Sequence, residues 1–352
     1  MNRYSRWLTS RGRTGSDLRR VSPTIRRFSR RFALSATLAW PVTMFAMLEQ
    51  PQPPWAASAP LDKPVLFAPG EVSTGEFDSH PAFQPDGRGL FFVKSNAVFT
   101  SWTIVFSRFE GGHWLTPTMA PFSGQYNDAD PFFTNDGGRL YFISDRPRAP
   151  GDERSDMDIW YVDRTPAGWG PPVNLGPPVN SSASEWFPTL ATDGTLYFGS
   201  GREGGKGGTD LYRAARTGEG FGQPENLGDS VNTPADEYEP LISPDQTLLV
   251  FMAIGRRDGL GAGDLYASRF VGNAWTPARN LGPPINSPAL EISPNVTPDR
   301  KYFFFSSSRQ IAVKPEAPRT YQQLLAGLQG PGNGLGDLYR LDLSVVLKGV
   351  QP

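Results

Sequence analysis

The chain has 352 residues, a net charge of −1 and no cysteine, which excludes disulfides, thiolate metal sites and cysteine nucleophiles. Its 38 Gly, 35 Pro and 23 Phe are the composition expected of many turns joining aromatic-rich strands. Residues 1–60 hold ten Arg and two acids, so the remainder carries a net charge of −9, which argues against nucleic acid as a partner.

The Arg-rich first segment ends in SRRFALSATLAWPVTMFAML (29–48), a twin-arginine pattern followed by a proline-broken apolar run. This pattern predicts an export signal and linker over residues 1–59, and therefore a periplasmic or secreted protein. Pro60 opposes cleavage after Ala59, so cleavage after Ser58 and retention as an uncleaved N-terminal anchor are both left open. No other membrane span is predicted. A later start codon is the alternative to an export signal.

Five copies of one segment follow, each with a proline, a Pro-Asp or Asp-Gly turn and an aromatic-rich strand. The aligned prolines are separated by 50, 57, 52 and 54 residues, a period typical of propeller blades made of short strands. The copies are SHPAFQPDGRGLFFV at Pro81, ADPFFTNDGGRLYFI at Pro131, WFPTLATDGTLYFG at Pro188, YEPLISPDQTLLVF at Pro240 and ISPNVTPDRKYFFF at Pro294.

Turn chemistry and alternation give the strand order within a copy. In the third copy, FPTLA is the innermost strand, followed outward by TLYFGS, TDLYRAAR and PENLGDSVNT. The fifth copy lacks an outer strand, and residues 65–83 share the pattern of residues 173–190. We therefore predict an all-β, five-bladed propeller of four-stranded antiparallel blades closed by the N-terminal strand. Six blades are the alternative, if part of the first long connection forms another.

The chain resembles the TolB-type, WD40-like β-propeller repeat family, whose motif SPDG…LYFSS…GG.DIY is matched by TDGTLYFGSGREGGKGGTDLY (192–212). The resemblance covers about residues 65–345, and we place the propeller at 60–352. It implies an exported stand-alone propeller. Because the same repeat occurs in assembly factors, peptidoglycan-linked proteins, sugar-acting lyases and peptidase propellers, the resemblance implies the fold and leaves the function open.

A carboxylate and a basic residue recur in every copy. The acids stand three residues before each aligned proline, and the basic residues follow each second strand: Asp78, Asp128, Glu185, Glu237 and Glu291, with Lys94, Arg146, Arg202, Arg256 and Arg309. Blade-to-blade ion pairs are one interpretation of this regularity. The other is a ligand-binding face, with Asp128, Arg146, Arg202 and Arg309 as contacts.

The residues directly before the aligned prolines break the repeat: His80, Asp130, Phe187, Glu239 and Ser293. Alternation predicts that they share one side of the innermost strand with the acids and line the channel mouth. His80, Asp130 and Glu239 are therefore candidates for acid–base catalysis or for a divalent metal, the one cofactor considered. The alternative is a set of channel groups satisfied by water and each other. The only other histidine, His113, is expected in an exposed turn.

Three further features complete the expectations. The insert at 309–337 contains PRTYQQLLAGLQG (318–330), which predicts one short helix in the last blade, either a lid over the channel or a helix on the rim. Trp102 is either a stacking surface for a ligand or a buried tryptophan between blades. Asp158, Asp210, Asp264 and Asp337 open third strands and are predicted to cap the backbone.

Two classes of function are consistent with these patterns. The first is a propeller that binds a peptide, partner protein or cell-wall glycan through its charged face. The second is a lyase or hydrolase acting on a carbohydrate or peptide, with a His/carboxylate site at the channel mouth. We favour the binding protein. A monomer is expected, because a closed ring leaves no sheet edge that demands a partner.

Overall fold

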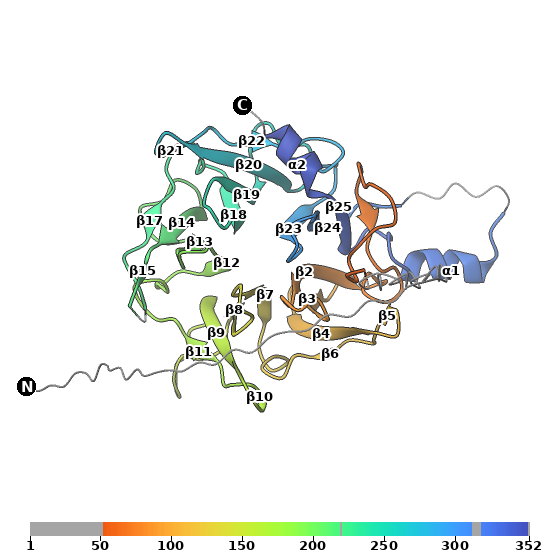
Figure 1. Cartoon of the computed structure of the whole chain (residues 1–352), viewed down its shortest axis with the longest axis horizontal. Coiled ribbons are helices and arrows are strands. Elements are labelled where there is room, and N and C mark those ends of the chain that lie inside the picture. Colours follow the sequence, from red (N-terminus) through yellow and green to blue (C-terminus); the bar gives the residue numbers. More distant parts are fainter. Residues whose placement is uncertain (1–51, 219, 312–317, 351–352) are drawn as a thin grey trace, which may run out of the picture. The chain divides into compact units, whose positions relative to one another are not determined.

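A computed structural model describes residues 52–218, 220–311 and 318–350. Figure 1 shows the sheets of this part arranged in a ring, with their first strands toward the centre. The predicted five-bladed propeller is confirmed, and the alternative of six blades is wrong, because five sheets make up the ring.

The first three strands of each blade run outward from the centre in sequence order, and neighbouring strands are antiparallel. The innermost strands are β2 (Phe77–Phe83), β7 (Asp128–Phe133), β12 (Glu185–Leu190), β18 (Asp236–Ile242) and β23 (Glu291–Val296). The second strands are β3 (Gly89–Ser95), β8 (Arg139–Ser144), β13 (Leu196–Ser200), β19 (Leu248–Ile254) and β24 (Tyr302–Ser307). The third strands are β4 (Trp102–Glu110), β9 (Asp158–Thr165), β14 (Asp210–Ala214), β20 (Asp264–Val271) and β25 (Asp337–Asp342).

The outer strands are two residues long: β6 (Thr118–Met119), β11 (Val173–Asn174), β17 (Glu225–Asn226), β22 (Arg279–Asn280) and β1 (Val65–Leu66). Short hairpins that carry an aromatic residue precede four of them: β5 (His113–Trp114), β10 (Gly168–Trp169), β15 (Arg216–Thr217) with β16 (Gly220–Phe221), and β21 (Ala274–Trp275). As predicted, β1 pairs with β25, so the segment before the first blade closes the last one.

Asparagine side chains extend the outer strands where backbone pairing stops. The amide of Asn180 accepts a hydrogen bond from the Ile159 N–H at 2.9 Å and donates one to the Ile159 carbonyl at 3.0 Å. Asn232 and Asn286 bind Leu211 and Leu265 in the same way. A buried backbone donor and acceptor are thus satisfied without a longer outer strand.

Apolar side chains fill the space between blades. One cluster joins Phe67, Phe83, Trp114 and Phe304, so it spans the point where the ring closes. Phe67 and Phe304 meet edge to face with ring centroids 4.9 Å apart. Because β1 carries the chain into this cluster, ring closure buries aromatic surface as well as pairing two strands.

The described segment before β1, from residue 52 on, is part of the same compact unit as the blades. Trp55 is 4% exposed and its ring lies 5.1 Å from that of Phe83. The Ala57 N–H donates to the Tyr302 hydroxyl at 3.0 Å, and Arg340 donates to the Trp55 carbonyl. Residues 52–59, which the sequence assigned to a linker, therefore contact the last blade.

The predicted helix is α1 (Tyr321–Gln329), whose N-cap Thr320 forms a capping box with Gln323. Figure 1 shows α1 at the outer side of the ring, away from the channel, so the lid hypothesis is wrong. The sequence analysis missed α2 (Leu343–Gly349), which directly follows β25 and buries Val346. Within the described residues, neither helix is long and apolar enough to cross a membrane.

The aspartates that open the third strands cap the backbone in three blades, as predicted. The N–H groups of Lys206, Leu260 and Gly332 each donate to one of these carboxylates. Asp158 is the exception, because it binds the side chains of Arg148 and Asn174 instead. In this blade an arginine replaces the backbone donors.

One carboxylate oxygen of Asp337 is buried without a hydrogen-bond partner, as is one oxygen of Asp264. Burial, together with the charge of Asp78, raises the pKa of Asp337 to about 7, although the Gly332 N–H and Lys94 oppose the shift. An ordinary aspartate ionises near 3.8, so the folded state loses stability as the pH rises from about 4 to 7.

We expect Asp337→Asn to stabilise the protein by about 1–3 kcal/mol at pH 8, because the amide keeps an acceptor for Gly332 and removes the buried charge. At pH 4, where the carboxyl is already protonated, the variant and the parent should be similar. Urea unfolding at both pH values measures the difference. Equal gains at the two pH values would contradict the titration of this group.

Candidate functional site

The innermost strands share a bulge at the residue before the aligned proline. In β2 the pairing with β3 shifts between Ser79 and Ala82, and the other four innermost strands shift at the matching place. The five residues at this position all have positive φ: His80 (54°), Asp130 (55°), Phe187 (47°), Glu239 (56°) and Ser293 (58°). Such backbone is rare outside glycine and marks a position that the surrounding fold enforces.

The bulge corrects the predicted side-chain orientation. Alternation placed Asp78 and His80 on one side of the strand, but His80 lines a cavity at the channel mouth whereas Asp78 does not. The same separation holds for Asp128 and Asp130, and for Glu237 and Glu239. A bulge adds one residue and turns the chain locally, so alternation does not carry across it.

His80, Asp130 and Glu239 meet in the channel, and we call these three residues the ion triad. His80 Nε2 lies 3.0 Å from Asp130 Oδ1 and 3.1 Å from Glu239 Oε1. His80 Nδ1 lies 2.8 Å from the Ser79 hydroxyl oxygen. The side chains are 4%, 6% and 10% exposed, respectively. The structure thus brings together the three residues that the sequence selected, from three different blades.

Backbone donors complete the ion triad. The Phe187 N–H donates to Asp130 Oδ2 at 2.8 Å, and the Ser293 N–H donates to Glu239 Oε2. Both donors belong to residues at the same bulge in the next blade, so each carboxylate links two blades through the channel. Each ionisable group of the ion triad therefore has polar contacts on two of its atoms.

The environment of His80 favours its charged form. Burial by itself lowers the pKa of the imidazole, but Asp130 and Glu239 outweigh it and raise the pKa to about 10. His80 is consequently an imidazolium at neutral pH, with both ring N–H groups donating. In that state it has no lone pair with which to accept a proton.

Aromatic side chains wall the cavity of about 350 Å³ above the ion triad. We call this cavity the aromatic cup; its aromatic walls are Phe77, Phe99, Trp102, Trp186 and Tyr238. Phe99 and Trp102 stack with centroids 5.0 Å apart, and the Phe99 ring lies 6.2 Å from that of His80. Trp102 is thus at the mouth, as one sequence interpretation held. The sequence analysis missed Phe99, Trp186 and Tyr238, of which the last two directly follow the repeated acids of blades three and four.

The five repeated acids are all paired with the five repeated basic residues. Lys94 binds Asp78, and the four arginines bind their acids at distances between nitrogen and oxygen of 2.5 to 3.2 Å. The predicted ion pairs are confirmed, with one correction. Each pair lies within a blade and not between blades, because the basic residue lies at or just after the end of the second strand and its acid lies near the start of the first.

The arginines also tie each blade to the chain segment that enters it. Arg202 donates to the Val179 carbonyl and packs over the rings of Phe198 and Tyr212, at 5.2 and 5.0 Å. Arg146 and Arg309 bind Phe122 and Ile285 in the same way. Asp128, Arg146, Arg202 and Arg309 do not line the aromatic cup, and their ligand-binding role stays a prediction.

We expect Arg202→Lys to destabilise the protein by about 1–2 kcal/mol, because lysine loses the planar contact with Phe198 and Tyr212 and the fork that reaches Val179 and Glu185. Arg108→Lys, at a 61% exposed side chain, is the control and should be neutral. Chemical denaturation measures both. A stable Arg202→Lys protein with impaired ligand binding would instead support a direct contact with ligand.

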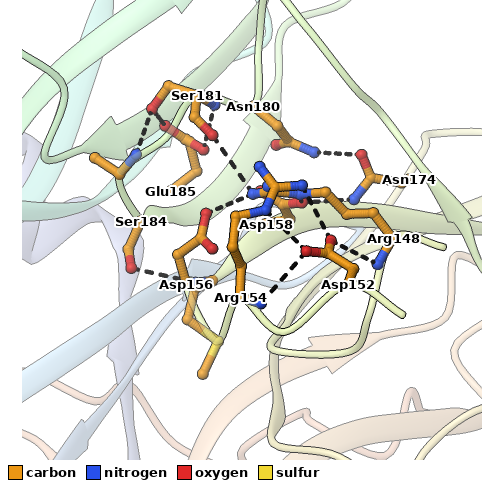
Figure 2. Close-up of polar contacts among 12 residues, drawn as sticks. Arg148, Asp152, Arg154, Asp156, Asp158, Asn174, Asn180, Ser181, Ser184 and Glu185 are labelled. Atoms are coloured by element: carbon orange, nitrogen blue, oxygen red, sulfur yellow. Dashed lines mark hydrogen bonds and ion pairs between the residues drawn. The ribbon is translucent and has the colours of Figure 1, made fainter. Parts of the chain in front are cut away.

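The insert between β8 and β9 holds a separate polar network (Figure 2). Arg148 lies between Asp156 and Asp158, and Arg154 pairs with Asp152 at 2.9 Å. The structure shows that Arg148 organises its acids, and these contacts account for the cluster without a bound cation.

Among the described residues, no group of three or more His, Cys, Asp or Glu side chains has an arrangement suited to a metal ion. The divalent metal considered for His80, Asp130 and Glu239 therefore stays a prediction, and chelation tests it below.

No protein-family model matches the chain, and no curated protein matches it either. Solved structures with similar folds include a candidate TolB from Agrobacterium tumefaciens, at 15% identity and a TM-score of 0.43, covering 76% of this chain and 90% of that one.

Two alpha-L-arabinofuranosidases are also similar. That of Podospora anserina has 15% identity and a TM-score of 0.44, covering 80% of this chain and 98% of its own. That of Lactobacillus brevis has 10% identity and a TM-score of 0.45, covering 77% and 92%. Similarities of this size carry no conclusion about activity, and membership of the TolB-type family stays a prediction.

Proposed function

We propose that this protein is a binding propeller, and that the aromatic cup receives one end of a peptide, partner protein or cell-wall glycan. The observation that carries the proposal is the closed hydrogen bonding of the ion triad beneath a cavity with aromatic walls. A cavity of about 350 Å³ is at the lower end of the range for ligand pockets, roughly 300–1,000 Å³.

The state of His80 favours binding over catalysis. A general base works best with a pKa near the working pH, whereas the pKa of His80 is raised to about 10 by the two carboxylates. The repeated acids, which do not line the cup, are likewise neutralised by their own basic partners. The ion triad is therefore better suited to form the rigid, charged base of a binding cavity than to transfer protons.

Thermal melts of the chain from residue 52 test this function, with panels of peptides, cell-wall fragments and acidic oligosaccharides, and with EDTA and divalent metals. A ligand at about 100 times its Kd stabilises the protein by about 2.7 kcal/mol, which a melt detects. The shift should disappear in Trp186→Leu and persist in Tyr321→Leu, which alters an exposed ring of α1. A shift that survives Trp186→Leu places the ligand elsewhere, and a loss of stability with EDTA supports a metal.

One observation favours an enzyme as the second candidate. Asp130 Oδ1 and Glu239 Oε1 contact the same nitrogen at 3.0 and 3.1 Å, which allows the spacing of roughly 5–5.5 Å found in a retaining carboxylate pair. Hydrolysis of glycosides or peptides that is lost in Asp130→Asn and in Glu239→Gln, while both proteins stay folded, would establish this alternative and displace the binding function.

We also propose that the protein acts in the periplasm or outside the cell. The support is the twin-arginine pattern at 29–48, which lies outside the described residues. Replacing Arg30 and Arg31 with lysine should keep a tagged protein in the cytoplasm. Unchanged export would point to the general secretory route, and a cytoplasmic parent protein would overturn the proposed location.

A further inference from the structure

We propose that the aromatic cup selects an alkylammonium group, carried by a lysine side chain of a peptide or protein partner. This inference rests on the proposed binding function and narrows it to one ligand chemistry. Its basis is the aromatic walls of the cup, the negative charge of the ion triad and the small number of hydrogen-bonding side chains in the lining.

The walls present several ring faces to one small space. The Phe99 ring stacks on the Trp102 ring with centroids 5.0 Å apart and lies at the same centroid distance from Phe77. Trp186 of β12 and Tyr238 of β18 form a second pair, with ring centroids 6.2 Å apart. A cation near the face of tryptophan, tyrosine or phenylalanine is attracted by the ring quadrupole. Clustered rings of this kind form the cages that bind quaternary ammonium groups.

Phe99 is held in this position against its own backbone preference. Its φ is 52°, which is uncommon for a bulky residue outside turns that require it. The Phe99 N–H donates to the Asn96 carbonyl at 3.0 Å, and Asn96 accepts from the Thr100 N–H at 2.8 Å, so a tight turn maintains the conformation. The turn directs an aromatic ring toward His80 where a small residue would fit the backbone better.

The floor of the cup is negative. Asp130 and Glu239 carry two negative charges, and the imidazolium of His80 offsets one of them. With a neutral imidazole, both negative charges would remain. The net charge of the ion triad is therefore negative in either protonation state of His80. Among the described residues that line the cup there is no lysine or arginine, and the ion pairs of both carboxylates are with His80 alone. In such a buried place a cation is attracted more strongly than in water.

The rest of the lining is apolar, which argues against a glycan. Ile143, Met252, Ile254, Leu290 and Ile292 provide no hydrogen-bonding side chain. Sugar hydroxyls left unpaired on burial would each cost about 1–3 kcal/mol. An alkylammonium group needs no hydrogen-bonding side chains, because the negative charge of the floor and the faces of the aromatic rings attract it. Ile254, which is 39% exposed, can pack against the aliphatic part of a lysine side chain.

Calorimetric titration with matched probes tests the inference on the chain from residue 52. Choline and 3,3-dimethylbutan-1-ol have the same shape and differ in charge, and we expect choline to bind about tenfold tighter. Nα-acetyl-lysine methylamide should likewise bind at least about fivefold tighter than N-acetyl-norleucine methylamide, whose shorter side chain lacks the ammonium group.

Variants locate the binding. Phe99→Leu keeps an apolar wall and removes one ring face, so it should weaken choline about threefold or more and change the neutral alcohol less than twofold. Tyr321→Leu, at a 68% exposed ring outside the cup, should change neither. Intrinsic tryptophan fluorescence of Trp102 and Trp186 gives a second readout of occupancy.

The outcomes separate this inference from the proposed function. Equal affinity for choline and the neutral alcohol, or no binding of either, overturns the selection of a cation, while the panel of larger ligands judges the binding function by itself. A preference for choline without a preference for the lysine amide over the norleucine amide overturns lysine as the source. A preference for both cations that Phe99→Leu reduces supports the inference.

Discussion

His80→Ala is expected to destabilise the protein by about 3–5 kcal/mol, because it leaves Asp130 and Glu239 buried without the cation that they share. The lost partner also links three blades across the channel, since the carboxylates come from β7 and β18 and the imidazole from β2. Urea unfolding near pH 6 measures the effect.

The contribution of His80 should depend on pH in a defined direction. The folded-state pKa is raised to about 10 from an ordinary value of 6.5. The stabilisation is therefore complete below about pH 6.5 and is lost as the pH rises through 10. Asp337, whose pKa is raised from 3.8 to about 7, affects stability mainly at lower pH, and its effect cancels in the difference between parent and variant.

The exposed His113 provides the matched control, and His113→Ala should stay within about 0.5 kcal/mol of the parent protein. An unfolding free energy of His80→Ala within 1 kcal/mol of the parent near pH 6 would contradict the stabilising role of the ion triad, on the scale of buried ion pairs. A difference that grows as the pH rises from 6.5 to 10 would contradict the protonated state of His80.

The second large effect is expected from Trp55→Ala, which should cost about 3–5 kcal/mol. Trp55 fills the space between Phe83 and the turn at Gly87, at the point where the first and last blades meet. Its removal leaves a cavity beside the aromatic cluster that closes the ring. A chain starting at residue 60 loses the same contacts together with the hydrogen bonds of Arg340 to Trp55 and Ala56.

Thermal and chemical unfolding of chains that start at residues 52 and 60 measures this contribution. Ser58→Ala, at an exposed position of the same segment, should have no effect. Equal stability of the two chains would show that residues 52–59 are dispensable. If the shorter chain is much less stable, cleavage after Ser58 would release a segment that the fold requires, which favours retention of the lead peptide over that cleavage site.

Much of the fold could be predicted because the five copies repeat local information. Each Asp-containing turn marks the hairpin between the first two strands, and the aromatic-rich run after it marks the second strand. The unpaired fifth copy and the matching segment at 65–83 together predicted that β1 closes the ring. Regular strands follow from such signals because turn chemistry and alternation act over a few neighbouring residues.

The site could be predicted only in part. Its ionisable residues were found because His80, Asp130 and Glu239 break a repeated position, which is visible in the sequence alone. Their side-chain direction was predicted wrongly for the neighbouring acids, because nothing local announces five bulges with positive φ. The assignment of α1 as a possible lid failed for a similar reason, since amphipathic pattern does not say where a helix packs.

The sequence by itself thus determined the number of blades, the strand order and the three residues that break the repeat, because these depend on short-range patterns. Only the tertiary structure decided that the three meet at one nitrogen, that the repeated acids are neutralised within their own blades, and that Phe99, Trp186 and Tyr238 form a cup above them. The ion triad and the cup join residues from separate blades, and the ion pairs of the repeated acids join strands that are distant in sequence. The energies of all these contacts depend on burial and distance, which exist only once the ring has closed.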